Sequence, residues 1–182
     1  MTSLSAGASA ARVAALEALF RTHHARILRT AFRLLGSMAD AEDVLQVVFL
    51  KLTRGLESYQ LSADAAGYIH RMAVNASLDL LRERPRAPTA VEPETLAGFA
   101  SAGPTPERQH RNTELHLALR AAIAQLGPQA ALIFTLRYLE GCDNTRIAQQ
   151  MKMSRVTVGV ILHRARQQLR KSLGEHWGRF HG

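Results

Sequence analysis

The sequence predicts an all-α protein made of two small helical domains joined by a flexible linker. Ala, Leu, Arg and Gln are plentiful while aromatic residues make up 5% of the chain, and this composition favours helix over sheet. The 182 residues allow one domain or two small ones. A central segment, residues 87–107, holds four of the six prolines and no basic residue, which is typical of a linker.

The net charge of +8 is distributed unevenly along the chain. Residues 1–86 carry 11 basic and 8 acidic side chains, residues 87–107 carry three acidic ones, and residues 108–182 carry 12 basic and 4 acidic ones. The strongly basic second half favours a polyanionic partner. The alternative for the central segment is a loop within one domain, but about 20 structureless residues are unusual in a compact domain.

Several classes of protein are disfavoured by what the sequence lacks. A single Cys permits neither a disulfide framework nor a cysteine-based zinc cluster. No run approaches the ~20 apolar residues that span a bilayer, and the first residues do not read as a secretory signal, so we expect a cytoplasmic protein. Without a Gly-rich phosphate loop, a nucleophile elbow or a metal-spaced cluster, we predict no enzyme, no cofactor and no metal.

Two amphipathic helices are predicted at the start of the chain. Apolar residues recur at three- and four-residue steps across 13–35, and Gly36 then ends the helix. We expect Asp40 to cap the next helix, 41–54, with Asp43 at the third helical position, where a capping box places its acid.

A loop and a third helix complete a small N-terminal bundle. Residues 55–64 break the helical periodicity and are predicted to form a loop. In the following helix, Asn75, Asp79 and Arg82 are spaced so that they share one face. A solvated polar face and a phosphate-facing surface both fit this pattern.

The second half begins with two further helices. Residues 115–126 form an amphipathic helix that ends at Gly127, and Pro128 suits the first turn of the next helix. Gly141 ends that second helix.

The most specific local pattern is a helix-turn-helix. Asp143 caps a short helix, Lys152 and Met153 make a tight connection, and Ser154 caps a second, arginine-rich helix. The apolar residues of that helix follow steps of four, three and four: Val158, Leu162, Ala165 and Leu169. The second helix of such a unit enters the major groove of DNA, where arginine can grip guanine or phosphate. A basic helix that lies on a membrane or binds a protein is the alternative.

Three motifs in order resemble bacterial sigma factors of the extracytoplasmic-function (ECF) type. They are DAEDVLQVVFLKL at 40–52, YIHRMAVNASLDLLRERPR at 68–86 and LRYLEGCDNTRIAQQMKMSRVTVGVILHRARQQLRK at 136–171. The resemblance extends from about Leu16 to Leu173. It implies a factor that binds core RNA polymerase and directs promoter recognition, DNA melting and transcription initiation.

The resemblance also assigns domains and residues. It implies a sigma-2-like domain at 12–86, a linker at 87–107, a sigma-4-like domain at 108–173 and a short tail at 174–182. The polymerase β′ coiled coil would be bound by Asp43, Gln46 and Phe49. The −10 element would be melted and read by the loop near 57–66 and by Tyr59, Tyr68, Asn75, Asp79 and Arg82. The −35 element would be read by Arg155, Thr157, Gly159, Val160, His163 and Arg164.

The chain departs from the usual family pattern at several positions. Val47 replaces a frequent acid, Tyr68 replaces a Trp, and Arg146 replaces a Glu. Gly159 and Val160 stand where polar or basic residues are common, so −35 readout would depend more on arginines, His163 and DNA shape. The polymerase β flap and an anti-sigma factor are further implied partners. The rival hypothesis is a stand-alone helix-turn-helix regulator with an unrelated sensing bundle, which would bind DNA without polymerase.

Overall fold

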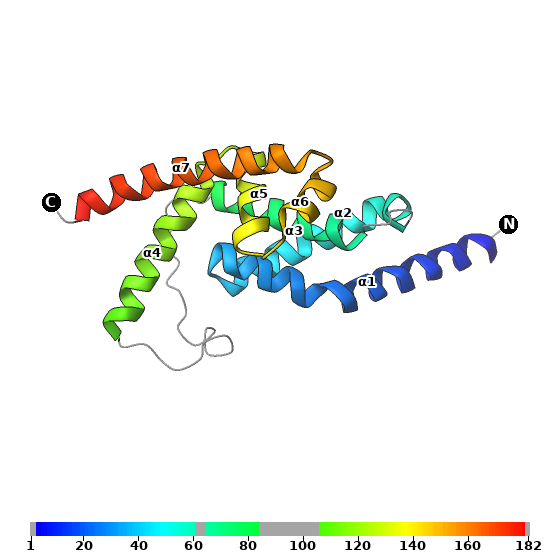
Figure 1. Ribbon diagram of the computed structural model, residues 1–182. Coiled ribbons are helices and arrows are strands. Elements are labelled where there is room, and N and C mark those ends of the chain that lie inside the picture. Colours follow the sequence, from blue (N-terminus) through cyan, green and yellow to red (C-terminus); the bar gives the residue numbers. More distant parts are fainter. Residues whose placement is uncertain (1–2, 61–64, 84–105, 181–182) are drawn as a thin grey trace.

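The computed structural model confirms the all-α prediction (Figure 1). It describes residues 3–60, 65–83 and 106–180, with side chains over 10–54, 65–83 and 114–174. Within these ranges every element is a helix: α1 (Ser3–Leu35), α2 (Met38–Gln60), α3 (Ala65–Glu83), α4 (Pro106–Ala124), α5 (Pro128–Tyr138), α6 (Asn144–Met151) and α7 (Arg155–Phe180). The predicted linker falls mostly on residues 84–105, outside the described part of the chain.

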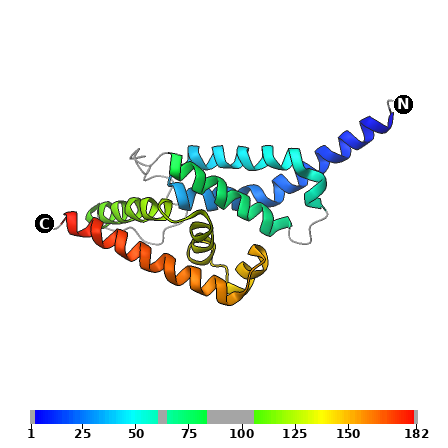
Figure 2. The ribbon, with the colours of Figure 1, turned by 90° about the horizontal axis from the view of Figure 1, so that it is seen from above.

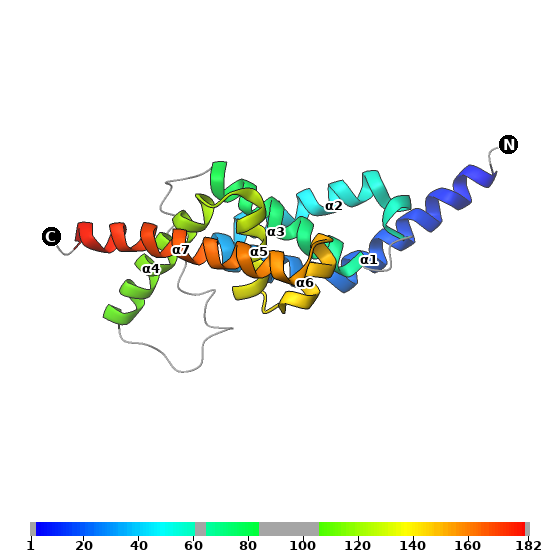
Figure 3. The ribbon, with the colours of Figure 1, turned by 45° about the horizontal axis from the view of Figure 1, so that its top comes forward.

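The helices form two groups that lie against each other. Helices α1, α2 and α3 pack together as a bundle, and α4 to α7 form the second group (Figure 2). The groups meet where α3 packs on α4 and α5. The N-terminal turns of α1 project beyond the bundle, and the two termini lie at opposite ends of the molecule (Figure 3).

The end of α1 is as the sequence predicts, but the start of α2 is not. Gly36 has φ +75, a left-handed conformation that glycine adopts freely, and its amide bonds to Phe32 O at 2.7 Å. The cap of α2 is Ser37, whose hydroxyl accepts from the Asp40 amide at 3.2 Å. The prediction that Asp40 is the cap is therefore wrong. Asp40 instead lies in the first turn, where a carboxylate favours the helix N-terminus.

The predicted loop at 55–64 is also wrong over its first part. Helix α2 continues through Gly55 to Gln60, and residues 61–64 lie outside the described ranges. A single glycine inside a helix costs only about 1 kcal/mol relative to alanine. That cost does not stop a helix whose earlier turns are anchored by the buried residues Val44, Val48 and Leu52.

In the second group, α5 is the central helix. Pro128 begins this helix as predicted, and the six consecutive residues Ala131–Leu136 within it are all buried. Gly141, with φ +68, follows its end. A helix that is apolar all round must be covered on all sides. Here α3, α6 and α7 supply that cover.

The boundaries of the second group differ from the prediction at both ends. Helix α4 begins at Pro106, so the last two residues of the predicted linker are helical. Helix α7 runs to Phe180, so the predicted tail at 174–182 continues the helix for most of its length. The buried apolar residues of both groups belong to one continuous core, from Ile27 in α1 to Leu169 in α7.

Candidate nucleic-acid interface

The helix-turn-helix of α6 and α7 has the predicted caps. The Asp143 carboxylate accepts from the Arg146 amide at 2.7 Å, and the Ser154 hydroxyl accepts from the Thr157 amide at 3.0 Å. Lys152 ends α6 in a left-handed conformation with φ 51. These local bonds fix the turn and hence the angle at which α7 leaves it.

The inner face of α7 is buried as predicted. Val158, Leu162, Ala165 and Leu169 are each less than 5% exposed. On the opposite face lie Val156 and Val160, four residues apart, with Gly159 and His163, also four residues apart. This outer face holds three of the six residues predicted to read the −35 element: Gly159, Val160 and His163.

The outer face of α7 is flanked by charge but has an apolar centre. Arg155, His163 and Arg164 are exposed, and Val160 is 45% exposed. Val156 is 77% exposed, and the sequence interpretation missed it. The sequence feature that could have identified Val156 is an apolar, β-branched residue in the first turn of the helix, on the side opposite the buried residues. Thr157 is also predicted to read the −35 element. Its hydroxyl forms a hydrogen bond with the Ser154 hydroxyl at 2.8 Å and so takes part in the helix cap.

A second exposed face runs along α2. Asp43 and Gln46 are exposed as predicted, and they share this face with Val47 and Leu50, which are 40% and 58% exposed. We call these four residues the α2 stripe. Phe49, the third predicted polymerase contact, is instead half-buried, and its ring lies 5.0 Å from that of Phe20 in α1. Leu50 is not among the polymerase contacts that the resemblance assigns, although helical spacing puts it on the same face as Asp43 and Gln46.

Four of the five residues predicted to read the −10 element share one face of α3: Tyr68, Asn75, Asp79 and Arg82. Asn75 and Asp79 are exposed, and the Asp79 carboxylate pairs with Arg82 at 3.3 Å. Tyr68 is half-buried, with the Arg71 guanidinium 5.6 Å from its ring centre. The side chain of Tyr59 lies outside the described residues, so its predicted role is not tested by this structure.

A buried polar cluster joins the two groups of helices. The Glu140 carboxylate, 6% exposed, accepts hydrogen bonds from Thr30 Oγ1 at 2.9 Å and from His70 Nε2 at 2.8 Å. Arg33 lies 3.6 Å from the same carboxylate and donates to Leu139 O at 2.9 Å. We call Thr30, Arg33, His70 and Glu140 the interface cluster.

The protonation of the interface cluster follows from its donors. Arg26 contacts His70 Nδ1 at 3.1 Å, and because a guanidinium can only donate, Nδ1 accepts and Nε2 carries the proton given to Glu140. Burial raises the pKa of Glu140, but hydrogen bonds from His70 and Thr30 and the charge of Arg33 outweigh it. The pKa therefore lies below its ordinary value of 4.5, and Glu140 is ionised at neutral pH.

Two further contacts join the groups. Arg71 of α3 donates to the carbonyl of Gln150 in α6, which brings the predicted −10 helix to the helix-turn-helix. The Arg120 guanidinium of α4 lies against Gly36, where a Cβ atom would collide with it. The groups are thus held together by specific polar contacts as well as by apolar packing.

Features of other functional classes are few in the described residues. No three His, Cys, Asp or Glu side chains gather there as metal ligands would. No helix in the same ranges is long and apolar enough to cross a membrane. Cys142 is buried, and burial raises the pKa of its thiol, which makes it unreactive.

Comparison with known proteins agrees with this division into two groups. Residues 19–87 match the family Sigma-70 region 2, and residues 116–169 match Sigma-70, region 4. The first match covers the second half of α1 and all of α2 and α3. The second match covers the second half of α4, all of α5 and α6, and α7 as far as residue 169.

Several curated proteins are similar to this chain over most of its length. The chain is 34% identical to the ECF RNA polymerase sigma factor SigE of Mycolicibacterium smegmatis, over 87% of this chain and 61% of that protein. It is 30% identical to SigM of Mycobacterium tuberculosis, over 88% of this chain and 78% of that protein. It is 24% identical to SigW of Bacillus subtilis, over 81% and 83%. With both regions present in order, the chain belongs to the family of ECF RNA polymerase sigma factors, the initiation factors of transcription.

Proposed function

We propose that this chain gives core RNA polymerase its promoter specificity and catalyses no reaction itself. The observation that carries the proposal is the capped helix-turn-helix of α6 and α7, with an exposed, arginine-flanked outer face on α7. It stands in one chain with a region 2 match. The proposed working units are a region 2 domain at 12–86, a linker at 87–107 and a region 4 domain at 108–173.

In the region 4 domain, the outer face of α7 is proposed to enter the major groove at the −35 element. Arg155 and Arg164 suit guanine edges or phosphates, and His163 suits a base edge. Val156 and Val160 are apolar and exposed, which suits contact with thymine methyl groups. Gly159 has no Cβ, so it lets the backbone approach the groove closely. Thr157 is proposed to support the cap rather than to read bases, because its hydroxyl is bonded to Ser154.

In the region 2 domain, the α2 stripe is proposed to bind the polymerase β′ coiled coil. Its two polar and two apolar members resemble the mixed character of protein interfaces, where a few apolar anchors supply most of the affinity. Val47 replaces an acid common in the family, which would make this contact more apolar than usual. Phe49 is proposed to hold α2 on α1 through Phe20.

The face of α3 is proposed to capture bases of the opened −10 element. Asn75 and Asp79 can hydrogen-bond to base edges, and Arg82 can contact phosphate while paired with Asp79. Tyr68 and Tyr59 are proposed stacking partners for unpaired bases, since each stacked base is worth roughly 1–3 kcal/mol.

The packed arrangement of the two domains cannot contact both promoter elements together. Elements centred at −35 and −10 lie roughly 25 base pairs apart, and at ~3.4 Å per pair the separation is about 85 Å. In the structure, however, Arg71 of α3 bonds to Gln150 of α6, so the two reading regions are neighbours. We therefore propose that the domains separate when polymerase and promoter are bound, and that the structure represents the free protein.

The closing experiment mixes the full chain with core polymerase and measures transcription from a library of promoters. We expect initiation from a defined promoter set that requires both −35 and −10 sequences. Val156→Ser should relax base preference at one −35 position, and the exposed Arg21→Met in α1 is the matched control. A stand-alone regulator would instead bind duplex DNA without polymerase and direct no initiation, which would overturn the proposal.

Further partners follow from the family and are proposed on that ground. The region 4 domain would contact the polymerase β flap, and an anti-sigma factor would bind the free protein. A factor that works on chromosomal promoters with core polymerase is proposed to act in the cytoplasm.

A further inference from the structure

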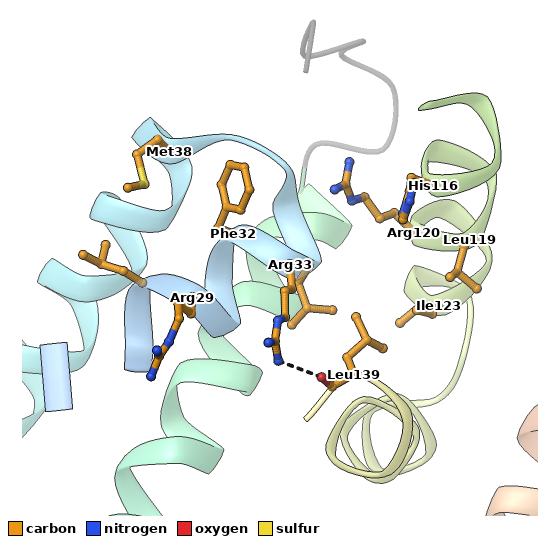
Figure 4. A pocket seen from close by; sticks show the side chains of 11 residues that line it. Arg29, Phe32, Arg33, Met38, His116, Leu119, Arg120, Ile123 and Leu139 are labelled. Atoms are coloured by element: carbon orange, nitrogen blue, oxygen red, sulfur yellow. Dashed lines mark hydrogen bonds between the residues drawn. The ribbon is translucent and has the colours of Figure 1, made fainter. Parts of the chain in front are cut away.

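A pocket lies between the two domains, where α1 and the start of α2 face α4 (Figure 4). Its volume is about 510 Å³, within the range of sites that hold small molecules. Phe32 of α1 and Leu119 and Ile123 of α4 line opposite sides, and Leu139 closes one end. The lining is thus largely apolar and comes from both domains.

The polar groups of the pocket are all basic. Arg29, Arg33, His116 and Arg120 contribute to its lining, and no Asp or Glu is among the described residues that line it. Arg33 already has Glu140 and the Leu139 carbonyl as partners. Arg120 has no hydrogen bond or ion pair within the described residues, and its Nε is buried without a partner.

Arg120 is held in place although none of the described residues supplies a counter-charge to it. Its guanidinium lies against Gly36, which has no Cβ atom, and burial lowers the pKa of Arg120. No acid among the described pocket residues offsets that change. Burial and the charge of Arg120 also lower the pKa of the neighbouring His116, so this imidazole is neutral at pH 7 and can donate a hydrogen bond. A half-buried guanidinium without an anion is unfavourable, so the site has an unmet preference for negative charge.

We propose that this pocket binds an amphiphilic anion, a small molecule with one carboxylate and an apolar body. The carboxylate pairs with Arg120 and His116, and the apolar body lies between Phe32 and Leu119. Medium-chain carboxylates have this chemistry and a suitable size. The charge of the site excludes apolar cations and disfavours neutral molecules of the same shape.

Because both domains supply the walls, the ligand binds the packed form and not the separated one. Binding to one of two forms shifts their ratio by a factor of one plus the ligand concentration over Kd, about 100-fold at 100 times Kd. The consequence rests on the proposed function: by stabilising the packed form, the ligand would hold the sigma factor away from promoters.

The test is calorimetric titration of the full chain with decanoate, without polymerase. We expect saturable binding with one site, and at least tenfold weaker binding of decan-1-ol, which has the same chain length but no charge. Arg120→Met should also weaken decanoate binding at least tenfold, while Arg120→Lys retains part of it. Arg21→Met, an exposed arginine of α1 outside the pocket, is the matched control and should bind as the wild type does.

Equal binding of decanoate and decan-1-ol, or full binding by a folded Arg120→Met variant, would overturn the proposal. Circular dichroism melts show whether that variant folds, and if it does not, Arg120→Gln takes its place. Failure of the ligand site can be distinguished from failure of the proposed function. Absence of decanoate binding with normal promoter-specific transcription removes only the ligand site, whereas decanoate binding without transcription removes only the sigma activity.

Discussion

The outer faces of this protein and the contact between its domains are built differently. The α2 stripe and the outer face of α7 expose side chains that no other described helix covers, and Leu50 and Val156 are 58% and 77% exposed. The interface cluster does the opposite, because it buries Glu140 and His70 and gives each a hydrogen-bond partner. The outer faces are suited to other molecules, whereas the interface is a specific contact that the proposed function requires to open.

The difference also explains which features could be predicted from the sequence. The caps Asp143 and Ser154 act over three residues, so local spacing was enough to find them. Glu140 pairs with His70 across 70 positions and with Thr30 across 110, and no local pattern connects them. His70 follows a buried Ile69 on α3 and gave only the weak signal of a polar residue beside an apolar one.

The two wrong predictions in the N-terminal bundle have physical causes too. Ser37 and Asp40 are both good caps, and the chain uses the first of them, so α2 begins earlier than expected. The sequence predicts a loop from Gly55, but packing of the preceding turns outweighs the weak helix propensity of this glycine. The outward sides of α2 and α7 could be predicted from helical spacing. The exception is Phe49, which the resemblance assigns to polymerase binding although its ring packs on Phe20, whereas Leu50 is exposed.

The largest expected effect is at the interface cluster. Glu140→Ala leaves the donors of Thr30 and His70 buried without an acceptor, so we expect a loss of about 3 kcal/mol in the free energy of unfolding. Urea denaturation measures the loss, and energy transfer between dyes on α2 and α7 reports separation of the domains. Glu42→Ala removes an exposed carboxylate of α2 and should change the stability by less than about 0.5 kcal/mol. If the two variants behaved alike, the cluster would not hold the domains together.

Acid should open the same contact by a smaller amount. The pKa of Glu140 is lowered in the packed form, so its stabilising contribution is complete above the ordinary value of 4.5. The contribution is lost as the pH falls through the lower pKa of the packed form. We expect dye separation to increase below pH 4.5 in the wild type and to change less in Glu140→Gln, which cannot ionise. An identical acid response in both proteins would assign the opening to other carboxylates.

On the outer side, the α2 stripe should matter for polymerase but not for the fold. Leu50→Asp places a charge in the proposed contact, and we expect at least tenfold weaker binding to core polymerase, about 1.4 kcal/mol. The thermal midpoint of the free protein should stay unchanged, because Leu50 is exposed. Fluorescence anisotropy measures the binding, again with Glu42→Ala as control. Unchanged polymerase affinity would move the docking surface away from this stripe.

The smallest expected effect is at the turn of the helix-turn-helix. Lys152 holds φ 51, which costs a non-glycine residue roughly 1 kcal/mol. Lys152→Gly removes that cost but gives the unfolded chain more freedom, so we expect a net gain of at most about 0.5 kcal/mol. Thermal unfolding measures it. A clear loss of stability would show that the lysine side chain makes a contact that stabilises the turn.

The single core that runs from α1 to α7 has a consequence for how the free protein unfolds. Although the chain matches two separate family regions, its buried residues form one continuous core, so we expect calorimetry of the free protein to give one transition instead of two. A variant that separates the domains would resolve that transition into two components. The number of heat-absorption peaks would then indicate, without any DNA or polymerase, whether the sigma factor is closed or open.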